Sequence, residues 1–149
     1  MRVDFYQLSR DPAEAVVALL AGKTLEAGER LLVVADDSAR LGKISEALWS
    51  ARPEESFLAN GRAGTADDAR QPILLSDRVE PANGAQFLLL ADGLWREEAT
   101  APGAFERVFL VFDAGTLEGA RACWRKLGTH DGLERNFWKQ EDGRWIRAA

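Results

Sequence analysis

Short apolar runs alternate with amphipathic stretches along most of the chain. The runs with the length of a buried strand cover residues 3–8, 30–35, 72–76, 85–92 and 106–113. Stretches with apolar residues at helical spacing cover residues 11–28, 36–51 and 115–128. Strands that alternate with helices predict an α/β fold, a mostly parallel sheet flanked by helices in a Rossmann-like, three-layer arrangement.

The ends of these elements are indicated by capping and turn residues. Asp11 is the predicted N-cap of the first helix, Thr116 caps the third, and Gly128 ends it. Residues 60–71 have the composition of a loop. Residues 134–149 predict a final strand or a hairpin that turns at Asp142-Gly143.

Length and composition indicate one globular domain, residues 1–149, because no repeat, linker or change of composition divides the chain. The sequence is 46% hydrophobic and 29% charged, which excludes disorder as its main state. The net charge of −5 argues against a surface that binds nucleic acid all over. The single cysteine, an amino-terminus without a signal-peptide pattern and the shortness of the apolar runs predict a cytoplasmic protein without a membrane partner.

The usual chemistry of α/β enzymes is missing from the sequence. No phosphate-binding loop and no G-x-G-x-x-G motif follows a predicted strand. Asp36 and Asp37 stand at the carboxyl end of a predicted strand, where they would hold magnesium or cap the next helix; the cap is the favoured interpretation. Cys123 and His130 are too few for a zinc site, and Cys123 has the small apolar neighbours of a packed thiol. We therefore predict no catalytic residue, cofactor or metal. The alternative is a nucleotide- or magnesium-dependent enzyme that uses Asp36 and Asp37.

One helix presents a face that is basic and aromatic. Arg121, Trp124 and Arg125 stand at positions i, i+3 and i+4, so two guanidinium groups flank one indole. Such a face suits a ligand that has both negative charge and a hydrophobic group. Two other interpretations stay open. Trp124 is turned into the core beneath a solvated arginine face, or Arg121, Arg125 and Lys126 bind single-stranded nucleic acid directly.

A second aromatic feature lies near the end of the second predicted helix. Trp49 is followed by Pro53, which breaks the helix, and then by Phe57. This aromatic pair is either a packing anchor, the favoured interpretation, or an exposed patch that binds another protein.

The sequence resembles a known family in three segments. These are EALWSARPEESFLANG at 46–61, ARACWRKLG at 120–128 and FWKQ at 137–140, and they resemble the chi subunit of bacterial DNA polymerase III. The order of the elements agrees with that family along nearly the whole chain, beginning with the opening MRVDFYQL.

The resemblance implies an accessory subunit of the replicative polymerase that is not itself a catalyst. Chi subunits couple the clamp loader to the single-stranded-DNA-binding protein, and through it to single-stranded DNA, by holding that protein's acidic carboxyl-terminal tail, which ends in phenylalanine. The family's tail-binding positions match Arg121, Trp124 and Arg125. The family's contact with its clamp-loader partner, psi or an equivalent subunit, matches the region of Trp49 and Phe57.

Overall fold

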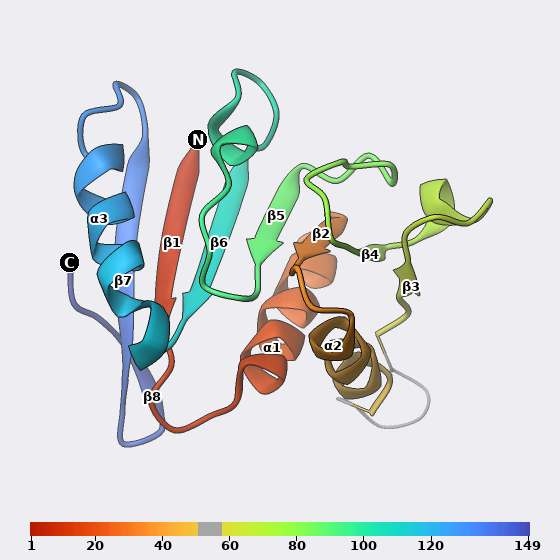
Figure 1. The fold of residues 1–149 in the computed structure, drawn as a ribbon, viewed down its shortest axis with the longest axis horizontal. Helices are drawn as coiled ribbons and strands as arrows, with labels where there is room; N and C mark the ends of the chain where they lie inside the picture. Colours follow the sequence, from red (N-terminus) through yellow and green to blue (C-terminus); the bar gives the residue numbers. More distant parts are fainter. Residues whose placement is uncertain (51–57) are drawn as a thin grey trace.

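A computed structural model describes residues 1–50 and 58–149, and in these residues one eight-stranded sheet runs through the molecule (Figure 1). The strands are β1 (Arg2–Gln7), β2 (Leu31–Val34), β3 (Gly61–Arg62), β4 (Ile73–Ser76), β5 (Phe87–Leu90), β6 (Arg107–Phe112), β7 (Glu134–Glu141) and β8 (Arg144–Arg147). Their order across the sheet is β3-β4-β2-β5-β6-β1-β7-β8, and all neighbours are parallel except the β7–β8 pair. The predicted α/β fold with a mostly parallel sheet is confirmed.

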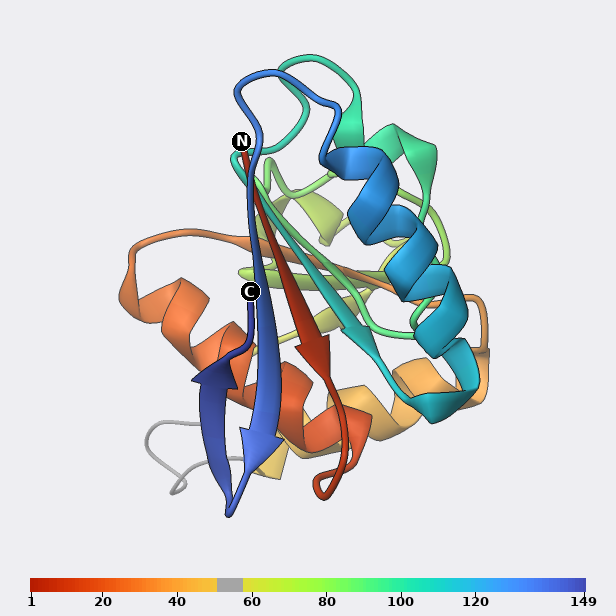
Figure 2. The ribbon, with the colours of Figure 1, turned by 90° about the vertical axis from the view of Figure 1, so that its left-hand side faces the viewer.

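The helices form a layer on each face of the sheet. α1 (Ala13–Glu26) and α2 (Ser38–Ser50) pack side by side on one face, and α3 (Leu117–Leu127) covers the other (Figure 2). Short 3₁₀ turns complete the connections: η2 (Asp68–Arg70), η3 (Glu97–Thr100) and η4 (Ala114–Thr116). Alternate residues of each central strand enter one or the other core, as Tyr6 does on the α1 face and Phe5 on the α3 face. None of the helices in the described residues has the length and apolar character needed to cross a membrane.

The predicted N-cap of α1 is wrong, and that of α3 is confirmed in its position. Pro12, not Asp11, occupies the N-cap position of α1, because the Asp11 carboxylate instead accepts a hydrogen bond of 2.7 Å from the side chain of Gln140. Thr116 does precede α3, but its hydroxyl does not cap that helix; Thr116 and Asp113 form a capping box around η4. Gly128 ends α3 as predicted.

The loop predicted at 60–71 contains a short strand. Gly61 and Arg62 pair with β4 as β3, an edge strand of two residues that is too short to leave an apolar pattern in the sequence. In the rest of this loop, Asp68 accepts hydrogen bonds from the N–H groups of Gly64 and Thr65. Those hydrogen bonds lower the pKa of Asp68 and occupy amides that a phosphate would need.

The predicted carboxyl-terminal hairpin is confirmed. β7 and β8 are antiparallel, and Asp142 and Gly143 join them with φ values of 49° and 75°. Positive φ at both positions is typical of the tight hairpin turn that Asp-Gly favours. Because β7 also pairs in parallel with β1, the hairpin extends the sheet beyond β1.

A buried carboxylate fixes the junction of β1, β6 and β7. Asp4 is fully buried, and its oxygens accept hydrogen bonds from the side chains of Arg107 (2.8 Å), Asn136 (3.1 Å) and Trp138 (3.1 Å). Arg2 adds a second ion pair at 3.2 Å. A buried charge is stable when it is paired and hydrogen-bonded in this way, so the three strands share one polar anchor.

Candidate functional site

The amphipathic character of α3 determines which of its side chains are available for binding. Ala120, Cys123 and Leu127 are buried against the sheet. Arg121 and Arg125 are exposed, and Trp124 lies at the border of the core. The three residues singled out from the sequence therefore occupy neighbouring positions on one flank of α3, where Trp124 contacts β7.

Trp124 belongs to both the core and the surface. Its ring makes edge-to-face contacts with Phe5 on β1 and Phe137 on β7, at centroid distances of 5.3 Å and 5.7 Å. It is nevertheless only half-buried. The ring is therefore held rigidly by the sheet while part of it remains in contact with solvent. Trp124 therefore fits in part both interpretations made from the sequence, a ring turned into the core and a ring available to a ligand.

A further cation, which the sequence analysis missed, lies against this indole. The guanidinium of Arg135, on β7, stacks over the Trp124 ring with its Cζ 4.1 Å from the centroid. The same guanidinium donates a hydrogen bond to the backbone carbonyl of Trp124. Arg135 therefore joins α3 to β7 and adds a third positive charge beside the indole.

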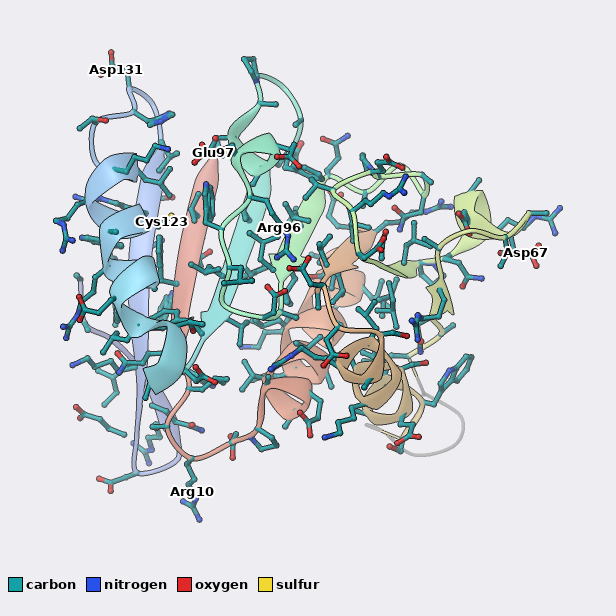
Figure 3. All side chains as sticks on the ribbon, in the orientation of Figure 1. Arg10, Asp67, Arg96, Glu97, Cys123 and Asp131 are labelled. Carbon is teal, nitrogen blue, oxygen red and sulfur yellow. The ribbon has the colours of Figure 1, made fainter. Side chains whose placement is uncertain are left out.

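The cations of α3 differ in how firmly they are engaged. Arg121 forms an exposed ion pair of 3.3 Å with Glu118, and Lys126 forms one of 2.6 Å with Glu97 of η3, which Figure 3 labels. The side chain of Arg125 has neither a hydrogen bond nor an ion pair with any residue in the described ranges. Exposed pairs of this kind contribute little to stability, so an acidic ligand can displace Glu118 at small cost.

Asp36 and Asp37 have separate structural partners. The Oδ1 atom of Asp37 accepts a hydrogen bond of 2.8 Å from the N–H of Ala39 in the first turn of α2, as the cap interpretation predicts. Asp36 forms an ion pair of 2.7 Å with Arg96, the residue labelled in Figure 3. Within the part of the chain that the structure describes, no group of three or more metal-ligating side chains includes either residue.

Arg96 is the central cation of this cluster, because it also pairs with Asp92 at 2.7 Å. Burial acts to raise the pKa of Asp92. The hydrogen bonds from Arg96 and from the N–H of Asp36 outweigh that effect, so the pKa of Asp92 is lowered. A guanidinium therefore already supplies the positive charge that a magnesium ion would bring to Asp36.

Cys123 and His130 do not form a nucleophile pair in an activating environment. Cys123 faces the core from α3 (labelled in Figure 3), whereas His130 is exposed in the turn after the helix. Burial, followed by the charge of Glu97, raises the pKa of the Cys123 thiol to about 12. An inert, packed thiol is the interpretation that the sequence favoured.

We expect Cys123 to resist alkylation in the folded protein. With a thiol pKa of about 12, roughly one molecule in 10⁴ carries the thiolate at pH 8. Iodoacetamide should therefore label the native protein far more slowly than the protein in urea, which mass spectrometry measures. Equally fast labelling in both states would contradict the burial of this side chain.

The second aromatic feature is described only in part. Trp49 lies near the end of α2 and is 46% exposed, a large value for tryptophan. Phe57 lies outside the described residues, so the pairing of these two rings remains a prediction.

The fold and the side chains of α3 together define an α/β protein with a basic and aromatic surface on one helix and its neighbouring strand. The family model of the DNA polymerase III chi subunit, HolC, matches residues 1–145, and the chain belongs to this family of accessory replication subunits. A comparison with curated proteins finds no match.

Proposed function

We propose that the flank of α3 formed by Arg121, Trp124 and Arg125 binds the acidic carboxyl-terminal tail of the single-stranded-DNA-binding protein. The observation that carries this proposal is the half-buried Trp124 ring, which the sheet holds in place on the same helix as the exposed side chains of Arg121 and Arg125. The tail combines carboxylates with a terminal phenylalanine ring, and this surface offers the complement of both.

The charges on this flank support the proposal. The guanidinium of Arg125 has no partner among the described residues, and that of Arg121 is engaged only by the exposed Glu118. Guanidinium groups bind carboxylates through paired hydrogen bonds, and one helical turn separates these two, so they can engage different carboxylates of one ligand. The ring of Trp124 then supplies apolar area for the phenyl group.

The proposed role is coupling, without catalysis. In this account the chain is a non-catalytic cytoplasmic subunit that holds the single-stranded-DNA-binding protein with α3 and contacts a clamp-loader subunit, psi or its equivalent, through the region of Trp49 and Phe57. The exposure of Trp49 supports the second contact. A groove between α1 and α2, lined by Leu19, Ala47 and Ser50 among others, lies in the same part of the molecule.

The experiment that tests the proposal is a titration of the tail as a synthetic peptide, followed by tryptophan fluorescence. We expect saturable binding that weakens as salt rises and as the terminal phenylalanine is removed. A single-stranded oligonucleotide serves as the comparison. Binding of the oligonucleotide without binding of the peptide would replace the proposal with the direct nucleic-acid interpretation.

We expect Trp49→Ala to weaken binding to the clamp-loader partner without unfolding the domain. Because nearly half of the Trp49 side chain is exposed, its removal leaves no large cavity in the core. If the ring is a central contact, the loss of affinity is on the order of 2 kcal/mol, roughly thirtyfold. Pull-down with the partner measures the affinity, and urea unfolding monitors the fold. A large loss of stability with unchanged partner binding would establish the packing interpretation instead.

A further inference from the structure

A groove lies on the face of the sheet opposite to α3. This groove has a volume of about 370 Å³ and runs between α1 and the strands β1, β5, β6, β7 and β8. Tyr6 stacks against Trp138 at 6.1 Å and meets Trp145 edge-on at 5.2 Å. Phe87 and Phe109 continue this aromatic surface. The volume lies within the range of small-ligand pockets.

The Tyr6 hydroxyl opens onto the groove and has no hydrogen-bond partner in the described residues. Tyr6 is 8% exposed and lines the groove, and no described residue accepts from or donates to its hydroxyl. In the described residues every fully buried side-chain N or O atom has a partner, so this hydroxyl is accessible from the groove, where a ligand can pair with it. Burial, together with the charge of Asp4, raises the pKa of Tyr6, so this hydroxyl is a proton donor at neutral pH.

Two cations border the same groove. Arg107 uses its Nε–H to hold Asp4 at 2.8 Å, and its Cζ lies 4.6 Å from the centroid of the Phe109 ring. Its two terminal nitrogens have no hydrogen bond with any described residue. Lys23 on α1 is exposed, and its ammonium group likewise has no partner among the described residues. No acidic side chain lines the groove.

The groove is therefore equipped to donate hydrogen bonds and to attract negative charge. Asp4 is fully engaged by Arg107, Asn136 and Trp138, so it offers no free acceptor. The Thr24 hydroxyl donates to the carbonyl of Leu20 at 2.8 Å, so it has no hydrogen left to donate to a ligand. Among the side chains that line the groove, only the hydroxyl oxygens of Tyr6 and Thr24 can accept from the N–H groups of a nucleobase, whereas a plain aromatic ring needs no acceptor.

From this chemistry we infer that the groove between α1 and the β1–β6–β7–β8 part of the sheet binds a carboxylate that carries an aromatic ring. The ring lies on the surface formed by Tyr6, Trp138 and Trp145. The carboxylate accepts from the Tyr6 hydroxyl and the free nitrogens of Arg107, and Lys23 adds positive charge at the rim. This site is independent of the α3 surface, because it lies on the other face of the sheet and shares no residue with it.

The test uses N-acetyl-L-phenylalanine as the probe, added to the full chain and followed by the indole N–H resonances of Trp138 and Trp145. We expect saturable shifts of both resonances. The amide of the same compound, which has no carboxylate, should bind at least tenfold more weakly. Deoxythymidine monophosphate is the nucleotide comparison. Absence of shifts with the carboxylate, equal binding of carboxylate and amide, or stronger binding of the nucleotide would each overturn the proposal.

Variants identify the groove as the site. Tyr6→Phe removes only the unpartnered hydroxyl, so we expect affinity to fall about tenfold while the unfolding midpoint stays the same. Lys23→Ala should weaken binding a few-fold, more so at low salt. Arg125→Ala, which removes a charge from the opposite face, should have no effect. Loss of affinity with Arg125→Ala but not with Tyr6→Phe would overturn the assignment to the groove.

One further comparison identifies the source of the ligand. A tripeptide that ends in phenylalanine and its carboxyl-amidated form present the same chemistry at the end of a polypeptide. If the free-acid tripeptide binds with the same dependence on Tyr6, the site accepts chain ends. If only N-acetyl-L-phenylalanine binds, it accepts a small free acid. Either result supports the groove as an aromatic carboxylate site, and neither depends on tail binding at α3.

Discussion

Asp4→Ala is expected to lower the free energy of unfolding by about 3–5 kcal/mol, the usual cost of breaking a buried ion pair by removing one partner. The substitution leaves Arg107 half-buried with its Nε–H unpaired, and it removes the acceptor of Asn136 and Trp138. These donors lie on β6 and β7, on either side of β1, so the loss affects the centre of the sheet.

Urea unfolding monitored by circular dichroism measures this effect. Asp67→Ala is the matched control, because Asp67 is an exposed acid in a loop and its loss should change stability by less than about 0.5 kcal/mol. Equal stability of the two variants would show that the Asp4 cluster contributes little to the sheet.

The second large effect concerns binding. The double variant Arg121→Ala/Arg125→Ala is expected to weaken binding of the acidic tail by about a hundredfold or more, since each lost charge-assisted contact costs roughly 1–3 kcal/mol. The single variants should differ: Arg125→Ala should cost more than Arg121→Ala, because Arg121 must first leave Glu118. For the same reason, Glu118→Gln should tighten binding a few-fold.

Lys126→Ala is the control for the double variant. It removes one positive charge from the same helix, but Lys126 is engaged by Glu97, away from the flank that holds Trp124. Tail affinity should therefore change little. If Lys126→Ala weakened binding as much as Arg125→Ala, the tail would be attracted by the overall charge of α3, and the specific site would be wrong.

The sequence predicted the fold well because its signals were local. Apolar runs such as 30–35 and 106–113 are long enough to show a buried strand, and Asp142-Gly143 is a strong turn signal. Features that depend on distant residues were not predicted. β3 forms because Gly61 and Arg62 pair with β4. Asp11 does not cap α1, because its carboxylate accepts a hydrogen bond from Gln140 of the hairpin.

The candidate site, like the fold, was predictable only where the signals in the sequence were local. Helical spacing placed Arg121, Trp124 and Arg125 on one flank, but it could not decide how deeply Trp124 is buried. That depth is set by Phe5 and Phe137, which strand pairing brings beneath α3 from opposite ends of the chain. Arg135 was not predicted as part of the site, because its contact with Trp124 also depends on the packing of β7 against α3. The aromatic groove beside α1 likewise depends on tertiary packing, because its residues come from five strands and one helix.

The central claim is that the tail of the single-stranded-DNA-binding protein binds beside Trp124. The most direct measurement is to follow the five tryptophan indole N–H resonances while the tail peptide is titrated into the protein. The account predicts a saturable shift of the Trp124 resonance that is abolished by Arg121→Ala/Arg125→Ala. An unmoved Trp124 resonance at saturation, or shifts confined to Trp138 and Trp145 across the sheet, would contradict it.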